Sequence, residues 1–109
     1  MILTAHVNHE GQKIVAIIDD ELLGQRIDAG DLELKFDSTF YRGTHMEEAT
    51  ILEEIRTAYM LNCAGERTVS FLIDNGFIVR EDVAIIGGVP YVYVVFSESA
   101  QEEPSSSGN

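Results

Sequence analysis

Three histidines and a run of carboxylates are the residues of this sequence whose types could support metal binding or acid–base chemistry. His6 and His9 stand three positions apart at the end of a predicted strand, and His45 lies much further along the chain. Two imidazoles four positions apart on a helix point at one ligand, but a three-residue step at a strand end does not aim them together. We therefore predict no metal site. The alternative that we keep is a small metal-binding protein or enzyme using His6, His9, His45 and the Asp19 to Glu21 corner.

The carboxylates Asp19, Asp20 and Glu21 follow directly after a predicted strand. Oxygen ligands of this kind can hold a divalent cation. Carboxylates at a strand end more often accept hydrogen bonds from the first turn of the next helix. We expect this acidic corner to cap the helical turn that follows it.

The sequence contains none of the short motifs that identify common catalytic or cofactor sites. G-x-S-x-G, H-E-x-x-H, C-x-x-C and Walker patterns are all missing. Gly87 and Gly88 open a predicted strand, whereas phosphate-binding glycines open a helix. Cys63 is the single cysteine, so it cannot form an internal disulfide, and we expect a buried free thiol. We therefore predict no catalytic residues and no cofactor.

The most unusual local feature is a polar amide, Asn62, within the apolar stretch 61–65. An asparagine there can cap a helix end, and this junction is also the first place where we expect a ligand or partner to dock. Tyr91 and Tyr93 share one strand face, which suits either core packing with the hydroxyls at the rim or a stacking platform. The residues that we predict to contact a ligand or partner are Asn62, Gly65, Tyr41, Arg42, Tyr91 and Tyr93.

The charge balance of the chain is strongly acidic. Its 19 Asp and Glu residues against 7 Lys and Arg residues give a formal net charge of −12. Such a surface repels phosphate backbones, so general DNA or RNA binding driven by counterion release is disfavoured. The cations are scattered along the sequence without clustering. Three interpretations of the charge remain: a basic protein partner, a local RNA contact, or solubility alone.

Length and composition indicate one soluble domain. The chain has 109 residues, of which 45% are apolar and 24% charged, close to ordinary globular usage. The longest apolar runs, at 14–18 and 89–96, are far shorter than the roughly 18 residues that a membrane-spanning helix needs. No basic segment followed by a long apolar one is present at the start of the sequence. We expect a cytoplasmic protein that does not associate with membranes.

The first half of the chain is predicted to form strands. Alternating apolar residues at 2–7 and 13–18, joined by a turn cluster at 8–11, indicate a β-hairpin. A short helical turn is expected at 19–24, bounded by carboxylates and a glycine. Residues 32–36 alternate between apolar and charged side chains, which predicts a third strand.

The middle of the chain is predicted to form two helices. Thr44 and Glu47 fit a capping box, and apolar residues from Met46 to Tyr59 recur at helical spacing. We expect this helix to end at 62–65, because glycine is common just past a helix terminus. A shorter helix follows, and we expect an αα-hairpin or a bent pair. The apolar stripe of that second helix consists of Val69, Leu72 and Ile73, and its stop signal is Asn75-Gly76.

The last part of the body is predicted to be a β-hairpin of strands 83–86 and 91–96, after a brief strand at 78–80. The predicted fold is therefore α+β: an N-terminal β-hairpin and third strand, two helices and a C-terminal β-hairpin, with the helices packed on one face of a mainly antiparallel sheet. We expect a single domain over 1–97 and a disordered acidic, Ser-rich tail over 98–109. An exposed edge at Tyr91–Phe96 would make a homodimer through the C-terminal strand a further alternative.

With these elements laid out, the chain resembles the mainly archaeal DUF424 family of uncharacterised proteins over residues 1 to about 96. The stretches that carry the resemblance are Met1-Ile2-Leu3-Thr4, Asp20-Glu21-Leu22-Leu23-Gly24, Phe40-Tyr41-x-Gly43, Asn62-x-x-Gly65, Asn75-Gly76-Phe77-Ile78 and Ile86-x-Gly88-Val89-Pro90. The family has no assigned activity, so the resemblance transfers no catalytic residues. It implies an archaeal source and, through the neighbourhood of the family's genes, a role beside translation and ribosome assembly factors. The acidic tail and Cys63 depart from the family's pattern, so we assign no function to either.

Taken together, the missing catalytic motifs and the strong negative charge favour a non-catalytic interaction module over an enzyme. The partner that we expect is a basic protein or a local RNA feature, associated with translation or RNA processing.

Overall fold

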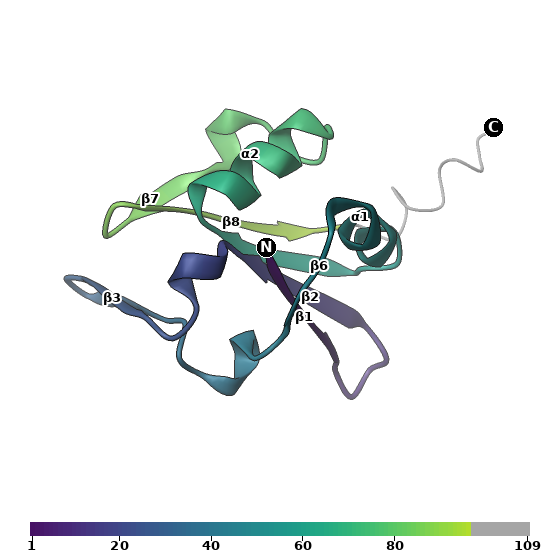
Figure 1. Cartoon of the computed structure of the whole chain (residues 1–109), viewed down its shortest axis with the longest axis horizontal. Helices are drawn as coiled ribbons and strands as arrows, with labels where there is room; N and C mark the ends of the chain where they lie inside the picture. Colours follow the sequence, from purple (N-terminus) through teal and green to yellow (C-terminus); the bar gives the residue numbers. More distant parts are fainter. Residues whose placement is uncertain (97–109) are drawn as a thin grey trace.

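A computed structural model describes residues 1–96 of the chain. It shows two helices on one side of a six-stranded sheet and a small β-hairpin, β3–β4, apart from that sheet (Figure 1). The predicted α+β class, with the helices on one face of a mainly antiparallel sheet, is confirmed. The predicted tail at 98–109, and with it the domain boundary at 97, lie outside the described residues.

The strands are β1 (Ile2–Val7), β2 (Lys13–Ile18), β3 (Arg26–Ala29), β4 (Leu32–Lys35), β5 (Thr44–His45), β6 (Met60–Ala64), β7 (Ala84–Ile86) and β8 (Val89–Val95). The α-helices are α1 (Glu48–Arg56) and α2 (Glu66–Asp74), and the 3-10 turns are η1 (Asp20–Leu22), η2 (Thr39–Tyr41) and η3 (Arg80–Asp82). Within residues 1–96, no helix has the length and apolar character needed to cross a membrane.

The large sheet has the strand order β5-β1-β2-β6-β8-β7. Strands β2 and β6 are parallel, and the other neighbouring pairs are antiparallel. Strand β8 is paired on both sides, to β6 and to β7. The pairing with β7 involves only residues 89–91 of β8, so within residues 1–96 the backbone of residues 92–95 has no strand partner on that side. A homodimer through the C-terminal strand stays a prediction.

The main error of the sequence-based prediction concerns residues 60–64. We expected them to end a long helix and to join it to the next one, but they form β6, the strand between β2 and β8. Leu61 and Cys63 are fully buried against the helices, and Ala64 is buried on the opposite face. Met60 and Ala64 on one face of β6 are as apolar as Leu61 and Cys63 on the other, so the sequence lacks the alternation that identifies strands. A short apolar run of this kind is indistinguishable from helix. No αα-hairpin forms, because a central strand separates α1 from α2.

Three smaller predictions were also wrong. Thr44 does not cap α1; it lies in the short edge strand β5, and Glu47 precedes the helix instead. Residues 78–80 contain no strand and lead into η3. The predicted third strand, residues 32–36, does not join the large sheet, since β4 pairs only with β3.

The main core lies between the helices and one face of the large sheet. Leu3 of β1, Ile17 of β2, Leu61 of β6 and Val92 of β8 point to this face. The residues of α1 and α2 that pack against them include Ile51, Ile55, Val69, Phe71 and Leu72. The apolar stripe predicted for the second helix is confirmed by this packing.

The opposite face of the sheet is covered at one end only. Phe36 and Tyr41, from the chain between β2 and β5, pack with Ile2, Ile18 and Ala64 in a second, smaller core. Gly43 permits this path, because a Cβ at that position would overlap the carbonyl oxygen of Leu3. The chain between β2 and β5 does not cover the other end of this face.

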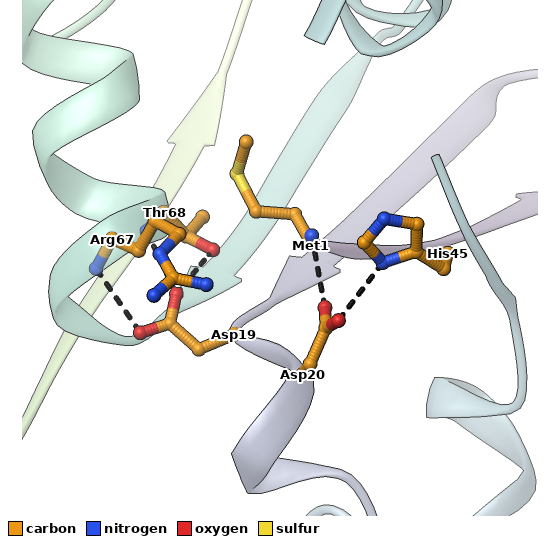
Figure 2. A network of polar contacts seen from close by, with 6 residues as sticks. All are labelled: Met1, Asp19, Asp20, His45, Arg67 and Thr68. Carbon is orange, nitrogen blue, oxygen red and sulfur yellow. Dashed lines mark hydrogen bonds and ion pairs between the residues drawn. The ribbon is translucent and has the colours of Figure 1, made fainter. Parts of the chain in front are cut away.

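A buried carboxylate lies at the C-terminal ends of the parallel strands β2 and β6 and links them (Figure 2). Asp19, which follows β2 and is only 4% exposed, accepts hydrogen bonds from the backbone N–H of Arg67 at 3.0 Å and of Thr68 at 2.8 Å. It also accepts one from the Thr68 hydroxyl at 2.8 Å. Arg67 and Thr68 belong to the first turn of α2. Gly65, with φ of 111°, directly precedes this helix, and a Cβ there would overlap the Asp19 carboxylate. We expected the corner to cap the next turn; instead Asp19 caps α2, a helix 48 residues away in sequence.

We predict that Asp19→Asn lowers the free energy of unfolding by about 2–3 kcal/mol, measured by urea denaturation. The substitution removes the charge that accepts N–H groups at the helix N-terminus, and it places an NH₂ group against one of those donors. Asp28→Asn is the matched control: Asp28 is exposed on β3 and should change stability by no more than about 0.5 kcal/mol. Equal stability of the two variants would contradict the assigned role of Asp19.

Candidate functional site

The three histidines of the metal-site alternative lie in different surroundings. The Nε2 atom of His6 is 2.9 Å from the carbonyl oxygen of Phe40, and the two rings stack with centroids 4.5 Å apart. His9 is exposed in the turn between β1 and β2. The Nδ1 atom of His45 is 2.9 Å from Asp20. Each side chain therefore has its own local role, and no common ligand position joins them.

The acidic corner is occupied by contacts within the chain (Figure 2). Asp19 is used by α2, and Asp20 lies 2.9 Å from both the Met1 ammonium and His45. The pKa of Asp20 is held below its usual value, mainly because the Met1 ammonium donates a hydrogen bond to it, with a smaller contribution from His45. Across residues 1–96, no three His, Cys, Asp or Glu side chains are placed to hold one metal ion. The geometry gives no support to the alternative built on these residues.

Cys63 is the buried thiol that we expected. It is 0% exposed in the middle of β6, and burial raises the pKa of its thiol to about 12. A thiol that keeps its proton at neutral pH is a poor nucleophile.

Two of the predicted contact residues meet on the half-covered face of the sheet. The Tyr41 hydroxyl donates a hydrogen bond to Oδ1 of Asn62 at 3.3 Å. Burial raises the pKa of Tyr41 to about 12, with smaller contributions from the neighbouring Tyr91 and Cys63. Burial also raises the pKa of Tyr91, while a hydrogen bond with Asn62 acts against that shift. The Asn62 amide thus connects two partly desolvated tyrosine hydroxyls.

Two other predicted residues, Arg42 and Gly65, lie elsewhere. Arg42 lines a separate hollow with Leu23 and Ser38 and takes no part in the Tyr41–Asn62 contact. Gly65 accommodates Asp19 and has a structural role. The structure therefore brings Tyr41 and Asn62 together, whereas Arg42 lies apart from them.

Beyond Asn62, the same face of the sheet is open to solvent. The register places Ile14 of β2, Met60 of β6 and Val95 of β8 in one row across the three strands, with Asn62 opposite Tyr93 in the next row. Tyr93 is 55% exposed and Val95 is 46% exposed, while the other three are half-buried. The Tyr93 hydroxyl donates to Sδ of Met60 at 3.4 Å. We call these five residues the open platform.

The composition of the open platform differs from the rest of the molecule. None of its five side chains is ionisable near neutral pH, although the chain has 19 Asp and Glu residues. Its side chains are aliphatic, thioether, amide and phenol groups, the types that supply packing area and a few directed hydrogen bonds at interfaces. The stacked pair His6 and Phe40 lies at the β1 side of this face. Such a surface can bind a partner, and it offers no nucleophile or general base.

The sequence prediction identified Asn62 and Tyr93 but missed Ile14, Met60 and Val95. It assigned residue 60 to a helix, so the row across β2, β6 and β8 did not exist in the predicted fold. Once β6 is recognised as a strand, the two-residue period places Met60 and Asn62 on one face.

Comparison with known proteins gives a family and a related structure, but no activity. The family model described as "Protein of unknown function (DUF424)" matches residues 7–96. A crystal structure of an uncharacterized conserved protein from Methanopyrus kandleri is 27% identical, covers 89% of this chain and 93% of that one, and superposes with a TM-score of 0.73. A search of curated proteins finds no match.

We predict that Tyr41→Phe reduces the loss of stability at alkaline pH. Because the pKa of Tyr41 is raised to about 12 from an ordinary 10, the unfolded chain releases this proton first as the pH rises. The contribution of Tyr41 is thus complete below pH 10 and is lost toward pH 12. At pH ~8 the variant should lose roughly 1 kcal/mol with the missing hydrogen bond. Urea denaturation across this pH range measures both effects.

Tyr93→Phe is the matched control for Tyr41→Phe. It removes a hydroxyl from an exposed tyrosine on the same face. The stability of Tyr93→Phe should fall with rising alkaline pH as steeply as that of the unmodified chain. An equally steep fall for Tyr41→Phe would contradict the assignment of this pH dependence to Tyr41.

Proposed function

The chain belongs to the DUF424 family of proteins of unknown function, and we propose that it is a non-catalytic interaction module. In this proposal the open platform binds an extended segment of a positively charged protein.

One observation carries the proposal: an uncharged, partly apolar surface is left uncovered on a chain with a net charge of −12. The large sheet is covered by α1 and α2 on one face, yet the cover of the other face stops at Tyr41. Exposed aromatic and aliphatic side chains that lie together mark interaction surfaces more often than chance exposure does. The Tyr93 and Met60 side chains supply the kind of area that anchors a partner side chain.

The negative net charge of the chain favours one of the two classes of partner. A segment rich in lysine and arginine would be drawn to this molecule and would approach the platform faster at low salt. Single-stranded RNA would need a positively charged groove along its backbone. None of the five platform residues is a cation, so a basic protein segment fits and RNA does not.

The size of the platform limits what it can hold. It crosses three neighbouring strands, which are spaced about 4.8 Å apart, and so it is roughly 10 Å wide. An extended chain of about three residues spans this width. The partner segment should therefore place one apolar side chain against Tyr93 and Met60, with basic residues on either side.

We further propose an archaeal cytoplasm as the setting and a translation or RNA-processing protein as the partner. The support is chemical: ribosomal proteins carry extended basic segments of the kind that this surface would select. The source of the related structure, Methanopyrus kandleri, is consistent with this setting.

We predict saturable binding of a short lysine- and arginine-rich peptide that carries a single central leucine. Two-dimensional NMR of the isotope-labelled chain should show shifts concentrated at Met60, Asn62 and Tyr93. Tyr93→Ala should weaken the affinity by about tenfold or more, since loss of an anchoring aromatic typically costs above 1 kcal/mol. The affinity should also fall as salt is added.

Ile85→Ala is the control for loss of exposed apolar area, because Ile85 is 65% exposed on β7, away from the platform. It should bind the peptide as the unmodified chain does. Equal weakening by Tyr93→Ala and Ile85→Ala would show that the contact is non-specific. Shifts at the platform caused by oligouridine RNA and not by the peptide would replace the protein partner with RNA.

A further inference from the structure

A second surface feature lies in the chain between β2 and β5, apart from the open platform. It is a hollow of about 410 Å³, within the size range of small-ligand sites. The residues that line it are Leu23, Gly24, Phe36, Asp37, Ser38, Arg42 and Gly43. Residues 23 and 24 follow η1, residues 36–38 precede η2, and residues 42 and 43 follow η2.

Three cations from one stretch of the chain, residues 26–42, lie in or beside this hollow. Arg26 and Lys35 are directly opposite one another in the β3–β4 hairpin, and Arg42 lines the hollow itself. These are three of the seven Lys and Arg residues of the chain. The scattered cations of the sequence analysis are therefore partly clustered in space.

The carboxylate in the hollow is already neutralised. Nε of Arg26 donates to Oδ2 of Asp37 at 2.8 Å, and Lys35 adds a weaker attraction to the same carboxylate. The pKa of Asp37 is lowered mainly by that hydrogen bond from Arg26. Arg42, in contrast, makes no side-chain hydrogen bond or ion pair with any residue in the described range 1–96. The lining thus keeps one uncompensated positive charge.

Neutral groups beside Arg42 would complete a site for an anion. The Ser38 hydroxyl has no hydrogen-bond partner among residues 1–96, so it can donate to a ligand. Gly24 has no side chain, and the space that a Cβ would take there is open, which lets a ligand approach the backbone closely. Leu23 and Phe36 add apolar lining for the remainder of a small molecule.

We propose that this hollow binds the oxyanion group of a small ligand, a carboxylate or a phosphate, through the guanidinium of Arg42 and the hydroxyl of Ser38. Arginine presents planar paired donors that match both kinds of oxyanion. This site is independent of the proposed partner surface, since no residue of the open platform lines it.

Titration of the isotope-labelled chain with inorganic phosphate, and separately with acetate, at constant ionic strength tests the proposal. Amide resonances of Ser38, Arg42 and Gly43 should shift along a saturating curve with at least one of the two anions. The anion with the higher affinity identifies the ligand as a phosphate or a carboxylate. Arg42→Gln should weaken that affinity about tenfold or more, and Arg42→Lys should weaken it less.

Arg56→Gln is the control for loss of a surface guanidinium. Arg56 lies on α1, is 73% exposed and pairs only loosely with Glu53, so its replacement should leave the anion affinity unchanged. Tyr93→Ala should also leave it unchanged, which separates this site from the partner surface. Linear shifts without saturation for both anions, or equal affinities of Arg42→Gln and Arg56→Gln, would overturn the proposal.

Discussion

The structure depends on one buried carboxylate, that of Asp19, which lies where the parallel strands β2 and β6 and the start of helix α2 meet. Asp19 ends β2, and the helix it caps begins directly after β6, the parallel partner of β2. A buried carboxylate is strongly unfavourable unless hydrogen bonds replace its water, and the two backbone N–H groups and the Thr68 hydroxyl do so. The contact requires a position without a Cβ at Gly65. Strand pairing, helix placement and this glycine are therefore mutually dependent.

The open platform results from the path that the chain takes after Asp19. In the part of the chain that the structure describes, α1 and α2 cover one face, and the segment between β2 and β5 covers part of the other. That segment forms the β3–β4 hairpin and η2, and then returns to β1 at Gly43, where the backbones are in close contact. Its cover ends with Tyr41 over Asn62. Ile14, Met60 and Tyr93 remain accessible because no other segment within residues 1–96 covers them.

Local patterns were sufficient for about half of this architecture. The β1–β2 hairpin, α2 and the β7–β8 hairpin each have alternation or a helical stripe with a turn signal at its end, and all three were predicted. Residues 60–64 were misassigned because apolar residues lie on both faces of this strand, so the sequence shows no alternation. Asp19 was recognised as a cap, but its partner helix is fixed by parallel pairing, which local sequence does not encode. The part of the site on β6 could not be found until that pairing was known.

Net charge is also a property of the whole chain, and folding determines where the charged side chains lie on the surface. The value of −12 argues against general nucleic-acid binding, yet it says nothing about single surfaces. Here the five platform residues carry no group that ionises near neutral pH, while Arg42 lines the hollow beside the Arg26–Asp37 ion pair. Screening confines each local charge to about 8–10 Å at physiological salt. A ligand within the hollow therefore experiences mainly Arg42 and its neighbours, whereas a large approaching partner experiences the acidic molecule as a whole.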